Sequence, residues 1–222
     1  MSKTPHVIRA FLFDLDGTLI DSKLDLANSV NAMLRQVGRA ELPTERVATF
    51  IGHGAPQLIA SALGPESTDE QRRTGLSLFF AHYELHKLDA TRTYPGVVEA
   101  LDALGAYPMA VLSNKHTNVS VEILHDLGLA KYFRSIYGGD SFEKKKPDPA
   151  GALKILQEFG VPPAQAAMVG DSEVDVQTAR NAGMFAVTVN YGFGVHDRAA
   201  HPADLYLDSL IDLVGLTRNH RS

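Results

Sequence analysis

Two carboxylates follow an apolar run near the start of the chain, in the stretch FLFDLDGTLID from Phe11 to Asp21. Asp14 comes directly after the run, and Asp16 stands two residues later. Carboxylates this close repel each other, and burying either one costs several kcal/mol unless a cation or hydrogen-bond donors compensate. The pair therefore predicts a site that attracts a positively charged group.

Further polar residues follow later expected strands: Ser113 and Asn114 after one, and Asp171 and Ser172 after another, with Asp175 one helical turn on. Lys146 stands before a proline-containing turn. Taken singly, each has an ordinary structural interpretation as a helix cap, a turn or exposed charge. Taken together with Asp14 and Asp16, they offer the hard oxygen ligands that Mg²⁺ prefers, without a His or Cys pattern. Because Mg²⁺ commonly shares its coordination with phosphate, the set predicts a magnesium and phosphate site.

Two features favour phosphate at this site. The Ser113 hydroxyl and the backbone N–H groups at strand ends can bind phosphate oxygens. Lys146 precedes a proline-stiffened turn, Pro147-Asp148-Pro149, which can hold its ammonium group near those oxygens. The neighbouring Lys144 and Lys145 are expected to be exposed.

The elements that must position these groups are buried strands. The nearly continuous apolar run from Val7 to Phe13 is typical of a strand buried on both faces. Helical patterns separate it from further strands expected at 109–112, near Ile136, and at 166–169, 185–189 and 204–207. This alternation predicts an α/β fold with a doubly wound parallel sheet, in which ligands bind at the carboxyl ends of the strands.

The long segment between Asp16 and Ser113 needs its own explanation, because it far exceeds one crossover helix. No convincing strand stands between about Ser22 and Ala90, whereas helical periodicity recurs throughout. An inserted helical unit explains this better than a long loop. We therefore expect a discontinuous α/β core, residues 1–20 plus 91–222, and a small helical cap domain, residues 21–90.

Composition narrows the function classes. Of 222 residues 45% are hydrophobic and 21% charged, an ordinary globular balance, and the net charge of −5 disfavours nucleic-acid binding. The absence of cysteine excludes disulfides and thiolate metal sites. No apolar run reaches the roughly 20 residues of a membrane helix, and the N-terminus does not look like a signal peptide. We expect a cytoplasmic protein without membrane partners, either a monomer or a homodimer.

The polar groups also resemble, in order, the motifs of the haloacid dehalogenase superfamily of phosphatases: Asp14-Leu15-Asp16-Gly17-Thr18, Leu112-Ser113-Asn114, Lys146-Pro147 and Gly170-Asp171-Ser172-Glu173-Val174-Asp175. The resemblance covers nearly the full length, and four ordered motifs are far more specific than one. It implies a Rossmann-like core with an inserted cap, and a Mg²⁺-dependent phosphatase that acts on a small phosphorylated molecule through an aspartyl-phosphate.

The same resemblance implies a role for each motif residue. Asp14 would be the nucleophile, Asp16 the general acid and then base, and Lys146 a group that stabilises developing charge. The implied metal ligands are Asp14, Asp16 through its backbone carbonyl, and Asp171. The residues implied to position the phosphoryl group are Thr18, Ser113 and Asn114. Asp175, with Ser172 beside it, would orient Lys146 or metal-bound water.

The substrate is implied by the cap. The loop Phe50 to Gly54 and the stretch Asp14 to Ser22 resemble those of phosphoglycolate phosphatases, which implies 2-phosphoglycolate as substrate. Gly52 and His53 of this loop are expected near the substrate. Lys115 and His53 are the cations expected to meet a substrate carboxylate, although an ordinary turn also explains His53.

Other activities stay open at this point. Asp16 favours ester hydrolysis or phosphoryl transfer, because dehalogenases and phosphonatases of the superfamily lack an aspartate at that position. The alternatives are a phosphatase for pyrophosphate, sugar phosphates or nucleotides, and a phosphomutase similar to β-phosphoglucomutase. A phospho-acceptor signalling domain is the alternative from another class. A catalytically silent binding protein is disfavoured, because no motif residue is missing.

Overall fold

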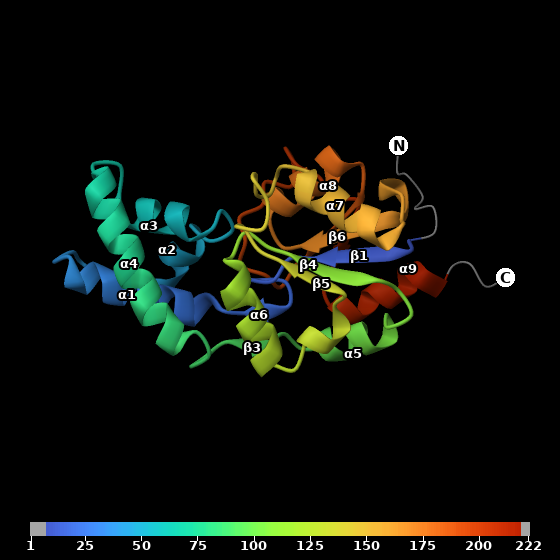
Figure 1. The fold of residues 1–222 in the computed structure, drawn as a ribbon, viewed down its shortest axis with the longest axis horizontal. Helices are drawn as coiled ribbons and strands as arrows, with labels where there is room; N and C mark the ends of the chain where they lie inside the picture. The colour runs from blue at the N-terminus through green and yellow to red at the C-terminus, as the bar shows by residue number, and fades with distance from the viewer. Residues whose placement is uncertain (1–7, 219–222) are drawn as a thin grey trace.

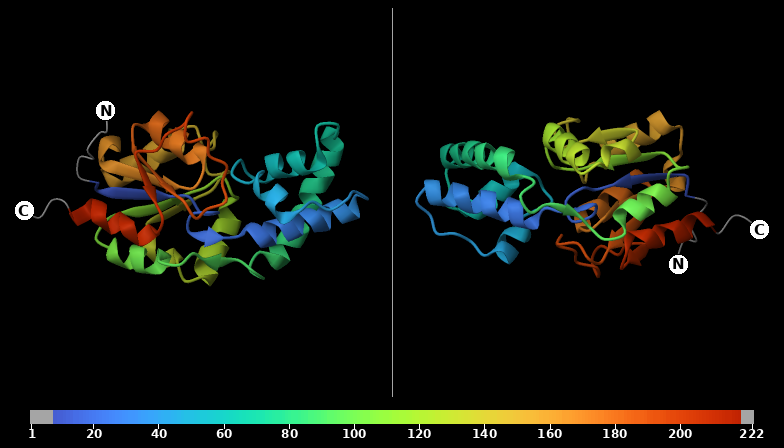
Figure 2. Two further views of the ribbon diagram at one scale, coloured as in Figure 1. Left: turned by 180° about the vertical axis from the view of Figure 1, so that it is seen from behind. Right: turned by 90° about the horizontal axis from the view of Figure 1, so that it is seen from below.

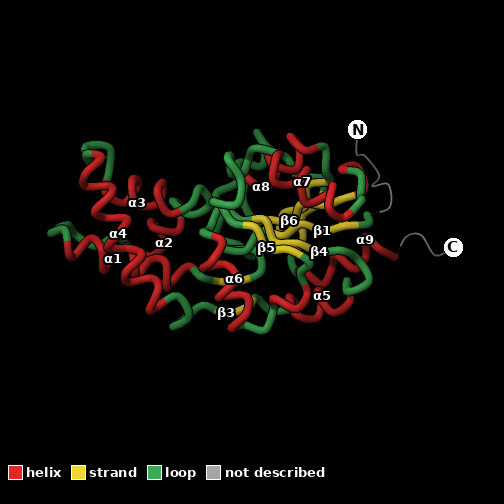
Figure 3. Tube along the Cα trace, viewed as in Figure 1, coloured by secondary structure: helices red, strands yellow, loops and turns green. Residues whose placement is uncertain are grey.

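A computed structural model describes residues 8–218 of the chain; Val7, placed by the sequence in the first strand, lies outside the described residues. Strands and helices are segregated in space. The sheet occupies one part of the molecule, whereas a group of helices without long strands occupies the other (Figures 1 and 3). The chain therefore has a sheet region and a helical region, as the helical segment after Asp16 predicted.

The sheet has six strands in the order β5-β4-β1-β6-β7-β8, and every neighbouring pair is parallel. Their bounds are β1 Ala10–Phe13, β4 Met109–Leu112, β5 Ser135–Tyr137, β6 Ala166–Gly170, β7 Phe185–Val189 and β8 Leu205–Leu207. After β1 the chain builds β4 and β5 on one side, then crosses to build β6, β7 and β8 on the other. This confirms the doubly wound sheet and puts its switch point beside β1.

Both faces of the sheet are covered, which is why the strands are apolar throughout. Ala10 and Leu12 of β1 face α7 (Ala150–Phe159) and α8 (Glu173–Ala182). Phe11 and Phe13 face the side of α5 (Val97–Ala103) and α6 (Thr117–Asp126). Three-residue and four-residue 3-10 turns and a last helix complete the described chain: Ala130–Tyr132, Pro163–Gln165, Leu210–Leu213 and α9 Val214–Arg218.

The helical region contains α1 (Lys23–Gln36), α2 (Thr44–Ala48), α3 (Ala55–Leu63) and α4 (Asp69–His86). Figure 2 shows these helices grouped beside the sheet region and joined to it by two neighbouring segments. Those segments hold β2 (Ile20–Asp21) and β3 (Arg92–Thr93), a two-stranded antiparallel ladder. Residues 22–91 contain no strand, as expected. The exact domain boundaries, 20/21 and 90/91, stay predictions.

A buried carboxylate ties the two connections together. Asp25, at the start of α1, is 1% exposed and accepts hydrogen bonds from the backbone N–H of Ala90 (3.0 Å) and Thr91 (2.7 Å) and from the Thr91 hydroxyl (2.7 Å). Asp25 therefore holds the start of α1 against the segment that leads back into β3.

No helix within residues 8–218 combines the length and the apolar character that a bilayer span requires. The cytoplasmic location and the monomeric or homodimeric state stay predictions.

Candidate active site

Asp14 lies where β1 ends, at the carboxyl edge of the sheet. Its backbone N–H donates to the carbonyl of Val169 in the adjacent β6, at 2.9 Å. Its Oδ1 accepts the N–H of Leu15 at 2.8 Å and lies 2.9 Å from the Nζ of Lys146. The side chain is thus held in one orientation, and its other oxygen, Oδ2, receives no hydrogen bond from the described residues.

Lys146 is the cation at the centre of this edge. Its side chain is 1% exposed, and its Nζ lies between Asp14 and Asp175, 2.7 Å from Asp175 Oδ1. Burial alone would lower the pKa of Lys146, but the two carboxylates raise it above the ordinary value. The ammonium group therefore stays charged where a phosphoryl group would approach Asp14.

Asp175 is itself positioned by the start of α8. Its Oδ2 accepts the Ser172 hydroxyl at 2.7 Å and the Ser172 N–H at 3.2 Å. Ser172 is the N-cap residue of α8. The same contacts therefore cap the helix and hold the Asp175 carboxylate in position. A side chain at Gly170 would collide with the Asp175 carboxylate, which explains the glycine.

Asp171 receives hydrogen bonds that the sequence did not predict. Its Oδ2 accepts the backbone N–H of Phe193 at 3.0 Å and of Gly194 at 2.7 Å, from the loop after β7. A Cβ at Gly17 or at Gly192 would collide with the same carboxylate. The signal in the sequence was the glycine-rich stretch 190–194 directly after a buried strand.

Asp14, Asp171 and Asp175 form a buried acidic cluster, in which one oxygen of each lies within 4.8 Å of the others. Burial, with the charge of Asp175, raises the pKa of Asp14 to about 6, and burial with the same neighbour raises the pKa of Asp171 well above its ordinary value. A divalent cation would compensate these charges, and carboxylate oxygens are suitable ligands for a hard ion. The cluster fits a divalent metal. Together with Lys146 it is termed the acidic floor.

Asp16 is held separately from the acidic floor. Lys115 Nζ lies 2.9 and 3.0 Å from its two carboxylate oxygens, and the Ser22 hydroxyl donates to Oδ1 at 2.5 Å. Although burial opposes the charge on Lys115, the Asp16 carboxylate raises the pKa of Lys115 above its ordinary value. Lys115, predicted for a substrate carboxylate, thus lies beside Asp16.

The remaining predicted core residues occupy different positions. Ser113 lines the pocket and accepts the Lys115 N–H at 3.3 Å. The Asn114 amide donates to the carbonyls of Gly52 (2.9 Å) and Lys146 (3.0 Å), so it links the helical region to the lysine loop. Thr18 is fully buried beneath the site, and its hydroxyl has no partner among the described residues.

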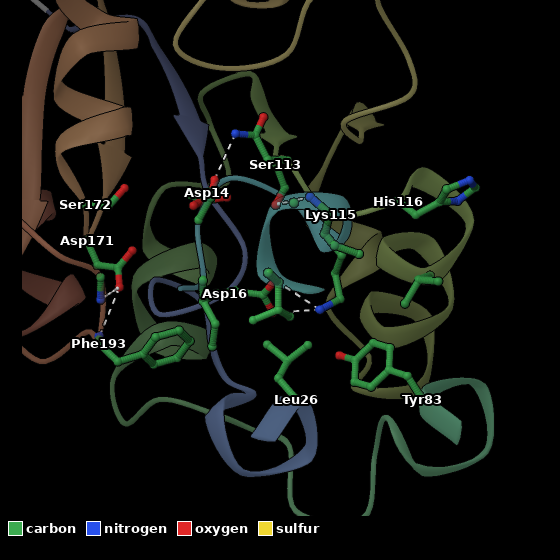
Figure 4. A pocket seen from close by; sticks show the side chains of 18 of the residues that line it. Asp14, Asp16, Leu26, Tyr83, Ser113, Lys115, His116, Asp171, Ser172 and Phe193 are labelled. Atoms are coloured by element: carbon green, nitrogen blue, oxygen red, sulfur yellow. Dashed lines mark hydrogen bonds and ion pairs between the residues drawn. The ribbon is translucent and has the colours of Figure 1, made fainter. Parts of the chain in front are cut away.

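A pocket lies between the acidic floor and the helical region (Figure 4). Its far side, termed the cap wall, is almost entirely apolar and contains Leu26, Ile51, Leu58, Phe79, Phe80 and Tyr83. Gly52 lines the pocket, whereas the His53 side chain is exposed and is not among the lining residues that the structure describes. The loop of residues 52–54 contacts the core through its backbone, because the His53 carbonyl also accepts the Lys145 Nζ.

Comparison with known proteins places this geometry among phosphatases. The family model for haloacid dehalogenase-like hydrolases matches residues 11–189. A phosphoglycolate phosphatase of Chromobacterium violaceum is 38% identical over 218 residues, covering 96% of this chain and 97% of its own. One of Pseudomonas savastanoi is 39% identical over 221 residues, with 96% and 79% covered. A crystal structure of a predicted phosphoglycolate phosphatase from Haemophilus somnus aligns with a TM-score of 0.88 at 31% identity, covering 95% and 98%.

Proposed function

The chain belongs to the haloacid dehalogenase-like hydrolase family, and we propose that it is a Mg²⁺-dependent phosphatase that hydrolyses 2-phosphoglycolate to glycolate and phosphate. One observation carries the proposal. The carboxylates of Asp14, Asp171 and Asp175 converge at the end of a pocket, and the Lys146 ammonium lies between Asp14 and Asp175. This is an arrangement for bringing a metal and a phosphoryl group to a fixed nucleophile.

Asp14 begins the reaction. A carboxylate oxygen of Asp14 attacks phosphorus, and the bond between phosphorus and the ester oxygen breaks, leaving an aspartyl-phosphate. The departing ester oxygen takes a proton from the Asp16 carboxyl, which gives glycolate. Ser22 and Lys115 hold the Asp16 side chain in place for this transfer.

Asp16 then acts as the base of the second step. It removes a proton from water as the water oxygen attacks phosphorus, and the bond from phosphorus to Asp14 breaks. Inorganic phosphate leaves, Asp14 is again a carboxylate, and Asp16 is again protonated for the next cycle. Every proton taken up by Asp16 is thus returned to a leaving group.

The other residues of the floor hold charge and geometry. Lys146 offsets the negative charge on Asp14 and on the transferring phosphoryl group, while Asp175 and Asn114 keep the lysine loop in position. Ser113, which lines the pocket, would contribute a hydroxyl group to phosphate binding, whereas Thr18 is fully buried and does not line the described pocket. When held by Asp14, the Asp16 carbonyl and Asp171, Mg²⁺ supplies positive charge that neutralises the phosphate and the acidic cluster.

Two observations support 2-phosphoglycolate rather than a larger phosphate ester. Relatives that cover nearly the whole chain are named phosphoglycolate phosphatases. The cap wall also lies directly opposite the acidic floor and is formed by bulky apolar side chains, including Phe79 and Phe80. A substrate with few atoms beyond its phosphate suits such an arrangement.

Phosphate release from a panel of metabolites tests the proposal. We expect Mg²⁺-dependent release, with 2-phosphoglycolate hydrolysed more efficiently than pyrophosphate, hexose phosphates or nucleotides, and loss of activity in EDTA that added Mg²⁺ restores. Interconversion of sugar phosphates without free phosphate would instead identify a phosphomutase. A long-lived phosphorylated protein without turnover would identify a signalling domain.

A further inference from the structure

The cap wall contains one buried polar group that the reaction steps above do not use. Tyr83 of α4 is 2% exposed, and its hydroxyl donates to no acceptor among the described residues. Its polar neighbour, the Lys115 ammonium, is itself a donor and leaves the hydroxyl proton unpaired. Buried hydroxyl groups in folded proteins are nearly always hydrogen-bonded, because an unpaired one is destabilising. Since Tyr83 lines the pocket, an unpaired donor there points to a ligand.

The position of this hydroxyl is well defined. The Tyr83 ring stacks on Phe79, with ring centroids 5.3 Å apart and planes 15° apart, and Lys115 Nζ lies 4.8 Å from the Tyr83 ring centroid. Lys115 in turn contacts both oxygens of Asp16. Figure 4 shows Tyr83 reaching into the pocket beside Lys115 and Leu26. The hydroxyl therefore belongs to the Asp16 end of the pocket, where the leaving group departs.

The chemistry of the substrate matches this place. In 2-phosphoglycolate the carboxylate carbon is two single bonds, each about 1.5 Å, from the ester oxygen that Asp16 protonates. The carboxylate must therefore lie next to Asp16, within reach of groups around Lys115. Burial raises the pKa of Tyr83 to about 12, so its hydroxyl stays protonated and can donate.

Other candidate donors near this end are already engaged or lie elsewhere. His116 lines the pocket, but its side chain is exposed and its Nε2 lies 3.1 Å from Asp140 Oδ2. His53 is exposed and does not line the described pocket. The rest of the cap wall is apolar. Tyr83 is thus the buried donor of the helical region that faces the leaving group.

We infer that the Tyr83 hydroxyl determines substrate specificity by donating a hydrogen bond to the carboxylate of the substrate, beside the Lys115 ammonium. The inference rests on the proposed function, because it assigns the group that recognises the non-phosphate end of 2-phosphoglycolate. A core lysine and a cap tyrosine then bind the carboxylate from two sides. An ester that lacks the carboxylate gains nothing from Tyr83.

The test compares two substrates in three proteins. Ethyl phosphate has the same ester linkage as 2-phosphoglycolate, with a methyl group in place of the carboxylate. Tyr83→Phe keeps the stacked ring and removes only the hydroxyl. Tyr137→Phe is the matched control, because the Tyr137 hydroxyl donates to Glu158 at the surface, away from the pocket. Thermal unfolding of all three full-length proteins verifies that each is folded.

For Tyr83→Phe, we expect kcat/KM for 2-phosphoglycolate to fall roughly tenfold or more, the loss typical of a hydrogen bond to a charged group. The value for ethyl phosphate should change less than about twofold, because the methyl group accepts no hydrogen bond. Inhibition by glycolate should weaken in parallel, while inhibition by inorganic phosphate stays the same. Tyr137→Phe should change none of these values.

Two outcomes would overturn the inference, and they are distinguishable. If Tyr83→Phe keeps the wild-type preference for 2-phosphoglycolate, or lowers kcat/KM equally for both substrates, the hydroxyl does not recognise the carboxylate. The proposed function is unaffected by that result. If the wild-type protein hydrolyses ethyl phosphate as efficiently as 2-phosphoglycolate, the proposed substrate is wrong, and the role of Tyr83 is lost with it.

Discussion

The acidic floor and the cap wall face each other across one pocket, yet the floor consists of charged residues and the wall mainly of apolar ones. The floor consists of four buried residues: Asp14 and Asp171 at the ends of β1 and β6, Lys146 in the loop after β5, and Asp175 in the first turn of α8. The wall presents apolar side chains from α1, α3 and α4 and the loop before α3, with Tyr83 as its buried polar group. The buried charges of the floor must be compensated by fixed ion pairs and hydrogen bonds. The apolar wall instead contributes mainly the shape of the pocket.

This difference separates two tasks. On the proposed function, the floor contacts only the metal and the phosphoryl group, which all phosphate esters share. On the same proposal, the wall and Lys115 contact the part of the substrate beyond the ester oxygen, where esters differ from one another. Changes to the floor should therefore affect every substrate alike, and loss of its buried cation should also lower stability, whereas changes to the wall should affect substrate preference at little cost in stability.

The largest effect is expected from Asp14→Asn. An amide is a poor nucleophile, so phosphate release should fall by roughly a thousandfold or more for every substrate of the panel. The fold should persist, which circular dichroism would verify. Asp126→Asn, at an exposed position in α6, is the control and should keep full activity. Substantial turnover by Asp14→Asn would show that Asp14 is not the nucleophile.

Lys146→Gln should weaken folding as well as activity. It leaves Asp14 and Asp175 buried without their cation, a change that typically costs about 3–5 kcal/mol of the free energy of unfolding. Lys144→Gln is the matched control, because the Lys144 side chain is 71% exposed and should contribute less than about 1 kcal/mol. Urea unfolding in EDTA measures both. Equal stabilities for the two variants would show that the floor needs no buried cation.

The floor should also couple metal binding to pH. Burial raises the pKa of Asp14 from 3.8 to about 6 in the folded protein, so the folded state binds this proton more tightly than the unfolded state. The stability from this group is complete below pH 3.8 and is lost as the pH rises through about 6. Because metal ligands must be deprotonated, Mg²⁺ is expected to raise Tm more at pH 8 than at pH 5. Thermal unfolding with and without Mg²⁺ measures this, and equal shifts at both pH values would contradict it.

The smallest effect is expected where the helical region touches the core. Gly54 (φ +85°) and Gly64 (φ +81°) flank α3 with the same type of backbone, so alanine should strain both similarly. A Cβ at Gly54 would lie 2.9 Å from the Asn114 carbonyl oxygen, whereas one at Gly64 meets nothing within 4 Å. Gly54→Ala should therefore raise KM several-fold and Gly64→Ala should not. Steady-state kinetics with 2-phosphoglycolate measure KM for both variants. Equal KM values for Gly54→Ala and Gly64→Ala would show that this contact does not shape the pocket.

Much of the fold followed from local pattern. The apolar runs predicted the strands of the sheet, because a strand covered on both faces needs apolar residues at nearly every position. Helical periodicity over 22–90 predicted a helical region, which the structure describes as α1 to α4. The ladder of β2 and β3 was missed, because two residues per strand carry no periodicity. The last helix, α9, was not predicted either.

The sequence alone determined which residues stand at strand ends and which family the chain resembles, because both depend on neighbouring residues and on ordered motifs. Only the tertiary structure decided which distant groups meet: the Phe193 and Gly194 amides at Asp171, Lys115 at Asp16, and Tyr83 opposite the acidic floor. The order of strands and the seating of the helical region create these contacts. Both arise from burying apolar faces across the whole chain, which no local pattern records.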